Sequence, residues 1–141
     1  MTYFGDRTLT SNGWAEAQMD IRSTLRELSE AFNAHDLDRI MAFFSDDCVL
    51  EMPRGNKPWG SRFEGKQTVR EALAARFEGL PDVHYGNDEH FVDSPADTGI
   101  SKWTLTGTTR DGTTVEVRGC DFYTFRNGKV IRKDSYWKIV E

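Results

Sequence analysis

The hydrophobic positions in the first third of the chain recur at spacings of three and four residues, which is typical of a helix that packs on one side. The longest such series is Trp14, Ala17, Ile21, Leu25, Leu28 and Phe32. Ser11 or Asn12 can cap the start of this helix, and Asp36 can cap a short second one. A third helix is predicted from Gly65 to Phe77. The residues before Trp14 lack this period, so we expect a flexible arm over residues 1–13 and a single domain over residues 14–141.

The later part of the chain changes to alternating apolar and polar positions, which indicates β-strands. After a short strand over residues 48–52, strands are predicted at residues 83–92, 101–109, 113–126 and 129–140, with Asn127-Gly128 as the turn before the last one. Residues 54–64 are rich in glycine and proline and are interpreted as an ordered loop that could close over a pocket. Helices followed by a run of antiparallel strands predict an α+β fold in the order α-α-β-α-β-β-β-β, with the helices on one face of a curved sheet.

The Asp111-Gly112 pair lies between two alternating runs and predicts a two-residue type I′ turn. Pairing outward from that turn places Lys102 opposite Asp121 and Thr104 opposite Gly119, on a face that also carries Val117, Tyr123 and Phe125. The other face then carries Trp103, Leu105, Phe122 and, from the last strand, Tyr136. Large apolar side chains on an outer face need cover, so we expect a homodimer through this convex face.

The composition narrows the choice of partners. The chain of 141 residues has the length of one domain, and its formal net charge of −5 with no basic run argues against nucleic acid or an anionic membrane. No stretch has the apolar length of a membrane span, and the N-terminus does not resemble an export signal, so we expect a cytoplasmic protein. Cys48 and Cys120 are expected to be reduced thiols within strands rather than a disulfide.

Two segments carry a resemblance to a known superfamily. They are AFNAHDLDRIMAFFSDDCVLEMP, residues 31–53, and GCDFYTFRNGKVIRKDSYW, residues 119–137. Both are similar to the nuclear transport factor 2-like superfamily, which includes steroid delta-isomerases and SnoaL-like polyketide cyclases. The resemblance implies a cone-shaped, antiparallel-rich sheet with three helices on its concave face. It also implies a small-molecule pocket, but no single activity, since isomerases, cyclases, dehydratases, epoxide hydrolases and non-catalytic modules share the scaffold.

Asp121 is the first candidate for chemistry. It takes the place of the aspartic acid that donates a hydrogen bond to the oxyanion in the similar steroid isomerases, where an apolar site keeps the carboxyl group neutral. The base of those enzymes falls at Met52, with Glu51 one residue earlier, and their oxyanion tyrosine falls at Leu28. The alternative for Asp121 is a structural ion pair with Lys102 across the predicted hairpin.

Glu51 and His90 are the candidates for a base. Glu51 can serve if the end of its strand turns inward, and the alternative is an outward glutamate beside Arg54. His90 is a candidate proton carrier, as in the similar dehydratases, or a hydrogen-bonded histidine of the sheet. The three histidines show no metal-ligand spacing, and neither a metal nor a cofactor is expected. The residues expected to line the pocket are Met52, Trp59, Phe63, Thr104, Val117, Gly119, Tyr123, Ser135 and Trp137.

Two functions remain open from the sequence. The first is cofactor-independent proton transfer next to a carbonyl on a small apolar ligand, in a reaction of the isomerase, cyclase or dehydratase type. The second is a non-catalytic ligand-binding or dimeric accessory module on the same scaffold. A third, epoxide hydrolysis, needs an aspartate–arginine–aspartate cluster that the sequence does not assemble.

Overall fold

The computed structural model describes residues 11–141, and it describes side chains from residue 20 onward. Three helices, α1 (Ser11–Asn33), α2 (Leu37–Met41) and α3 (Lys66–Gly79), accompany six strands. The strands are β1 (Phe44–Glu51), β2 (Arg62–Glu64), β3 (His84–Asp93), β4 (Thr98–Thr108), β5 (Thr114–Arg126) and β6 (Lys129–Trp137). Most of the predicted arm lies outside the described residues, and Ser11–Gly13 at its end already belongs to α1. No helix in the described part of the chain is long and apolar enough to cross a membrane.

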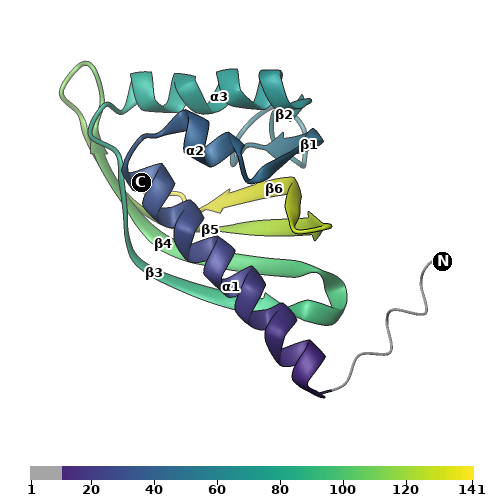
Figure 1. Ribbon diagram of the computed structural model, residues 1–141. Coiled ribbons are helices and arrows are strands. Elements are labelled where there is room, and N and C mark those ends of the chain that lie inside the picture. The colour runs from purple at the N-terminus through teal and green to yellow at the C-terminus, as the bar shows by residue number, and fades with distance from the viewer. Residues whose placement is uncertain (1–10) are drawn as a thin grey trace.

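The six strands form one curved sheet in the order β2-β1-β6-β5-β4-β3. β1 and β6 pair in parallel, and the other neighbours are antiparallel. In Figure 1, α1 crosses the face of the long strands diagonally, and α3 lies across the end of the molecule near β1 and β2. The predicted α+β architecture is confirmed, with the addition of β2, which is formed by three residues of the segment interpreted as a loop.

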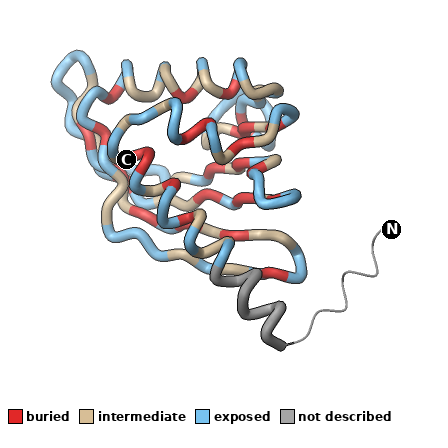
Figure 2. Tube along the Cα trace, viewed as in Figure 1, coloured by how far each residue is buried: buried red, intermediate tan, exposed pale blue. Residues whose placement is uncertain are grey.

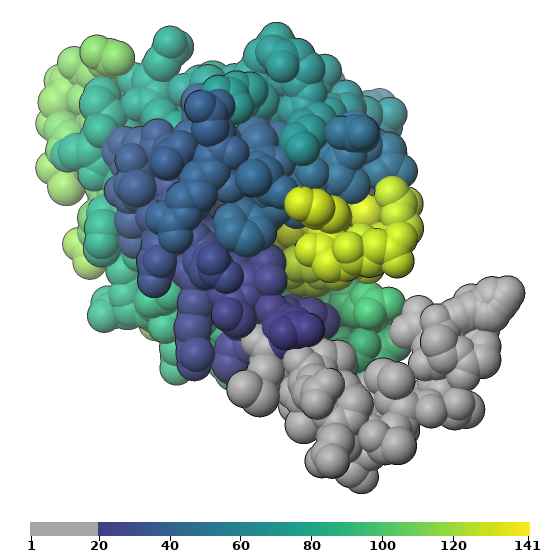
Figure 3. Space-filling view, in the orientation of Figure 1, coloured from purple at the N-terminus to yellow at the C-terminus, as the bar shows by residue number. Residues whose placement is uncertain are grey.

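The hydrophobic core lies between the helices and the face of the sheet that they cover, which we call the inner face. Buried positions alternate along the long strands, as the red segments of Figure 2 show. The larger cluster joins α1, α2 and α3 to the sheet and includes Leu25, Leu28, Phe32, Ile40, Phe44, Leu50, Val69, Leu73 and Tyr123. The smaller cluster lies towards α3 and consists of Leu80, Val83, Trp103, Leu105 and Val117. Figure 3 shows that α1 and α2 cover much of the helix side of the molecule.

The register predicted for the β4–β5 hairpin is wrong by one residue. Gly112 alone of the predicted turn pair has a positive φ, +89°, and the loop is closed by the Thr109 amide donating to the Thr113 carbonyl at 2.9 Å. This is a longer loop with glycine at its left-handed position, not a two-residue type I′ turn. Ser101 therefore lies opposite Asp121, and Trp103 lies opposite Gly119.

The shift exchanges the two faces of β4, because side chains alternate along a strand. Trp103 and Leu105, expected on the convex face, are 4% and 0% exposed in the core. Lys102 and Thr104 lie on the convex face instead, and Lys102 is 3.6 Å from the Glu89 carboxylate. Phe122 and Tyr136 lie on the convex face as predicted, with 40% and 54% of their surface exposed.

Two local predictions are confirmed. Asp36 caps α2, because its side chain accepts a hydrogen bond from the Arg39 amide at 3.1 Å. Asn127 and Gly128 both have positive φ, +53° and +77°, as a type I′ turn between β5 and β6 requires.

Candidate functional site

A buried polar cluster lies on the inner face of the sheet, where β4, β5 and β6 run side by side. Asp121 of β5 is 4% exposed, and its Oδ1 accepts hydrogen bonds from Lys133 Nζ at 3.0 Å and Ser135 Oγ at 2.5 Å. Its Oδ2 accepts a hydrogen bond from Trp103 Nε1 at 2.8 Å. Lys133 Nζ also donates to Ser135 Oγ at 3.0 Å. We call these four residues the Asp121 cluster.

The partners of Asp121 suit a carboxylate rather than a neutral carboxyl group. Indole N–H and ammonium groups only donate, so both oxygens of Asp121 must accept. Two donors occupy Oδ1 and one occupies Oδ2, which leaves one acceptor position on Oδ2. The alternative for Asp121, an ion pair with Lys102, is also wrong, since Lys133 from β6 provides the positive charge. The expected role of Asp121 as a hydrogen-bond donor does not fit this set of partners.

Gly119 makes the position of Trp103 possible. A Cβ atom at Gly119 would lie 2.6 Å from the Trp103 ring and 2.4 Å from the Tyr136 carbonyl oxygen. Such contacts are far inside van der Waals distance, so a side chain there would displace the indole. The space beside Gly119, a residue expected to line the pocket, is thus taken by the ring that bonds Asp121.

Two small cavities adjoin the Asp121 cluster, and each has about 20 Å³ of free volume. Tyr85, Trp103, Asp121 and Lys133 line both of them. That volume is enough for about one water molecule, well below the several hundred Å³ of a pocket for a drug-sized ligand. A ligand that reaches Asp121 must therefore displace side chains.

Aromatic rings surround the cluster and lower the polarity of its environment. Lys133 Nζ lies 5.4 Å from the ring centre of Phe32 and 6.0 Å from that of Tyr123. Burial raises the pKa of Tyr85 to about 12 and raises the pKa of Tyr123 as well, with the Asp121 charge adding to both shifts. The effective dielectric constant of such surroundings is lower than that of water. Electrostatic interactions at the Asp121 cluster are therefore stronger than they would be in water.

The sequence matches the family model of the SnoaL-like domain over residues 25–133, which is more than half of the chain. The protein belongs to the SnoaL-like family. No curated protein matches it in sequence.

Solved structures share the fold of this SnoaL-like protein at low sequence identity. A candidate polyketide cyclase of Xanthomonas campestris pv. campestris has a TM-score of 0.78 at 17% identity, covering 86% of this chain and 93% of that one. A phenazine biosynthesis-related protein of Pseudomonas aeruginosa has a TM-score of 0.79 at 16% identity, covering 92% and 86%. TerC crystallised with polyporic acid has a TM-score of 0.70 at 21% identity, covering 84% and 91%. These similarities establish the nuclear transport factor 2-like fold.

Glu51 lies on the opposite face of the sheet from the Asp121 cluster. It is 0% exposed and pairs with Asp134 in the β1–β6 register, whereas Leu50 pairs with the inward Lys133. Arg62 donates to Oε2 of Glu51 at 2.9 and 2.6 Å, and Arg132 donates to Oε1. Burial by itself would raise the pKa of Glu51, but these hydrogen bonds outweigh it and hold the pKa below its usual range.

This placement changes the interpretation of Glu51. The sequence offered an inward base or an outward glutamate beside Arg54, and the side chain is outward but bonded to Arg62 and Arg132 instead. A carboxylate with a lowered pKa and both oxygens occupied is a poor base.

His90 lies between the inner cavity and the outer surface. Its Nδ1 is 2.9 Å from Ser101 Oγ, which lines an inner cavity, and its Nε2 is 2.9 Å from Asp88 Oδ2 at the surface. The backbone carbonyl of His90 accepts a hydrogen bond from Arg22 at 2.5 Å. His90 is thus a hydrogen-bonded histidine of the sheet without direct contact to Asp121. No cluster of three or more potential metal-ligating side chains occurs in the described part of the chain.

The remaining predicted pocket residues fall into three groups. Met52, Ser135 and Trp137 line one cavity beside Asp121, and Tyr123 lines the other. Val117 is buried in the smaller core cluster. Neither cavity is lined by Thr104, Trp59 or Phe63. Thr104 lies on the convex face, and Trp59 is 44% exposed beside Arg62. Phe63 packs against the larger core cluster.

Sequence reasoning missed three residues of the site. Lys133 is not among the predicted functional residues, although it alternates along its strand with the predicted pocket residues Ser135 and Trp137, and a lysine that shares a face with a pocket is itself a signal. Trp103 was assigned to the wrong face by the hairpin register. Arg76 of α3, which lies 4.5 Å from the ring centre of Trp137, gave no signal in the sequence.

Proposed function

We propose that this SnoaL-like protein binds a small apolar, carbonyl-bearing molecule at the Asp121 cluster and catalyses proton transfer next to the carbonyl without a cofactor. The reaction would be of the isomerase, cyclase or dehydratase type. The observation that carries the proposal is the buried Asp121–Lys133 pair on the walls of both inner cavities. A buried pair of ionisable groups on the wall of a cavity is a candidate for a catalytic site.

The geometry favours Asp121 as the base and Lys133 as the group that stabilises the enolate oxygen. Asp121 Oδ2 has one acceptor position left after bonding Trp103, and that position can receive a proton from the carbon next to the carbonyl. Lys133 brings a positive charge to the same cavities, where a developing negative charge on oxygen would be stabilised. Ser135 holds both groups in place through its hydroxyl.

Hydrogen–deuterium exchange of 2-tetralone in D₂O tests this proposal, because the ketone loses an acidic C–H proton to form an enolate. We expect the wild-type protein to speed the exchange, and Asp121→Asn to slow it about 100-fold or more, in line with the usual contribution of a general base. Asp46→Asn, which changes an exposed carboxylate on β1, is the matched control. Proton NMR measures the rates. Equal rates for Asp121→Asn and wild type, with circular dichroism showing both folded, would refute the assignment.

A non-catalytic binding module is the second candidate, and the small free volume of the inner cavities favours it. About 20 Å³ on each side of the Asp121 cluster leaves no room for a substrate without movement. In that case the Asp121–Lys133 pair is a structural ion pair. Binding of 2-tetralone without faster exchange in the wild-type protein would support this function over catalysis.

A homodimer through the convex face is part of the proposal. Phe91, Phe122 and Tyr136 are 51%, 40% and 54% exposed there, and an apolar crevice of about 490 Å³ runs beside them. An exposed patch of this kind is typical of a subunit interface, and a second copy offers the same apolar surface in return. Sedimentation velocity should show a dimer for wild type and a monomer for Phe122→Glu.

The cytoplasmic location stays a prediction, which fractionation of the source cells would test.

A further inference from the structure

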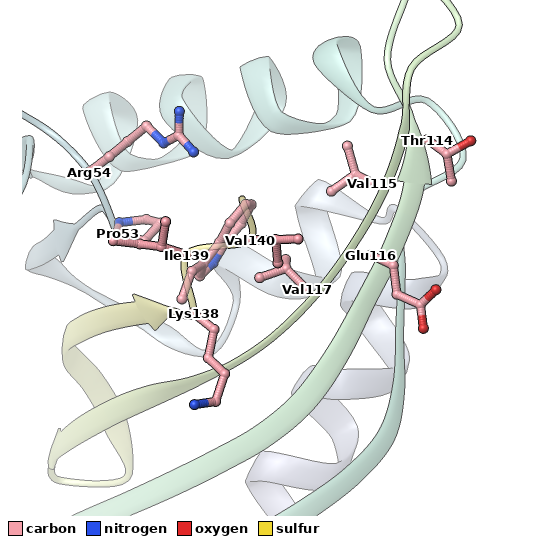
Figure 4. A pocket seen from close by; sticks show the side chains of 10 residues that line it. Pro53, Arg54, Thr114, Val115, Glu116, Val117, Lys138, Ile139 and Val140 are labelled. Carbon is pink, nitrogen blue, oxygen red and sulfur yellow. The ribbon is translucent and has the colours of Figure 1, made fainter.

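An open crevice of about 530 Å³ lies outside the inner cavities, between the loop after β1 and the C-terminal end of the chain. Its walls include Pro53, Arg54, Val115, Val117, Trp137 and Ile139. In Figure 4, Val115 and Val117 point into the crevice, whereas Thr114 and Glu116 extend beyond the other side of β5. The crevice is therefore apolar where Val115 and Val117 face it, and its lining also includes the charged residues Arg54, Glu116 and Lys138.

The crevice and one inner cavity share a wall. Pro53 and Trp137 line both the crevice and the cavity that holds Asp121, Lys133 and Ser135. Trp137 also meets the Trp103 ring edge-on, with 6.3 Å between the ring centres. A displacement of the Trp137 side chain would thus join a crevice of ligand size to the buried Asp121 cluster.

Positive charge collects at this wall. The guanidinium of Arg76 lies 4.5 Å from the ring centre of Trp137 and lines the inner cavity, and Arg54 lines the crevice. Within residues 20–141, neither arginine forms an ion pair with a carboxylate, in contrast to Arg62 and Arg132, which share Glu51. Lys133 is paired with Asp121, so the cations available to a ligand are Arg76, Arg54 and Lys138, which also lines the crevice.

We propose that the crevice binds a flat aromatic carboxylate, whose ring stacks on Trp137 and whose carboxylate pairs with Arg76 and Arg54. This rests on the proposed function in one respect, because it names the class of molecule that would reach Asp121. A guanidinium recognises a carboxylate through two parallel hydrogen bonds. A volume of about 530 Å³ falls within the range of small-molecule sites.

The same geometry predicts how the ligand would open the inner cavity. The stacking of Arg76 on Trp137 holds the indole against the cavity wall. A carboxylate that engages Arg76 competes for the guanidinium and weakens this contact. The acid group of the ligand would then remain at the mouth, while its uncharged part reaches the Asp121 cluster, where a second negative charge would be repelled.

Calorimetric titration with 2-naphthoate and with its uncharged analogue 2-naphthamide tests the proposal. We expect wild type to bind 2-naphthoate at least tenfold more tightly than 2-naphthamide, since a charge-assisted pair is gained. Arg76→Gln should weaken 2-naphthoate binding about tenfold and leave 2-naphthamide binding unchanged, and Arg76→Lys should recover part of the loss. Arg70→Gln, which changes an arginine on the same helix that pairs with Asp38, is the matched control.

The outcomes separate this inference from the proposed function. Equal affinity for the two ligands, no binding of 2-naphthoate, or the same 2-naphthoate affinity for Arg76→Gln and wild type would overturn the anion site, whatever the 2-tetralone exchange shows. Selective, Arg76-dependent binding of 2-naphthoate would support the site even if Asp121→Asn exchanged 2-tetralone as fast as wild type. Circular dichroism of Arg76→Gln establishes that the variant is folded.

Discussion

Asp121 and Glu51 are both carboxylates buried in the same sheet, and both are paired with cations, yet their surroundings differ. Asp121 faces the helices, bonds one lysine, one serine and one indole, and lines two cavities. Glu51 faces the other side of the sheet and is held by two arginines whose side chains are 40% and 49% exposed. Burial and pairing therefore do not by themselves mark a site. Asp121 differs from Glu51 in two ways. It lies on the face of the sheet that lines the cavities, and its Oδ2 can still accept one more hydrogen bond.

The two clusters should also respond differently to the loss of a cation. Asp121 has a single cationic partner, and Lys133 is itself 9% exposed in its side chain. Glu51 has two cationic partners, so one arginine remains when the other is removed. An unpaired buried charge is far more costly than a pair that is weakened.

The largest expected effect is that of Lys133→Met, which should lower the free energy of unfolding by about 3 to 5 kcal/mol, because it leaves the Asp121 carboxylate buried without a cation. Urea unfolding followed by circular dichroism measures it. The double variant Asp121→Asn with Lys133→Met should recover part of the loss, since it removes the unpaired charge. Arg132→Met is the comparison on the other face, and a loss as large as that of Lys133→Met would contradict the distinction between the two clusters.

Glu51→Gln should have an intermediate effect of about 2 to 3 kcal/mol at pH 7, smaller than for fully buried pairs because the two guanidinium groups are partly exposed. The folded-state pKa of Glu51 is lowered, so its stabilisation is complete above the unfolded pKa of about 4.3 and is lost as the pH falls through the folded pKa.

The difference between wild type and Glu51→Gln should therefore shrink as urea unfolding is repeated from pH 7 down to pH 3. The rate of 2-tetralone exchange should not change in this variant. A constant stability difference across that pH range would rule out the lowered pKa, and a large fall in exchange rate would move Glu51 into the catalytic site.

The smallest expected effect is that of Lys102→Gln, the residue that the predicted hairpin register paired with Asp121. Lys102 is 46% exposed in its side chain and lies 3.6 Å from Glu89. An exposed pair of this kind contributes less than about 0.5 kcal/mol. Urea unfolding of Lys102→Gln should thus overlap that of wild type, and a loss close to that of Lys133→Met would favour the predicted register over the observed one.

The local features of the fold could be predicted because neighbouring residues decide them. The apolar stripe of α1, the cap at Asp36 and the turn at Asn127-Gly128 each depend on residues within a few positions of one another. The inner face of β5, with Val117, Asp121, Tyr123 and Phe125, follows from alternation along one strand. β2 is the exception, since it was not predicted. It consists of only three residues in a segment rich in turn signals, which are too few to show a period.

The site could be predicted only in part, since its partners come from different strands. Asp121 meets Lys133 across β5 and β6 and meets Trp103 across β4 and β5. The hairpin loop sets which face of β4 turns inward, and one extra loop position moved Trp103 in and Lys102 out. The arginines that hold Glu51 come from β2 and β6, whose register against β1 no local signal fixes.

Local sequence is enough to predict the order of the helices and most of the strands, the α+β class, the SnoaL-like resemblance and the inward direction of Asp121. Contacts between distant segments set which cation pairs with which buried carboxylate, how little free volume surrounds Asp121, and that Arg76 stacks on Trp137. The physical reason is that side-chain direction along one strand repeats every second residue, whereas contacts between strands depend on loop geometry and register. A shift of one residue there exchanges the two faces.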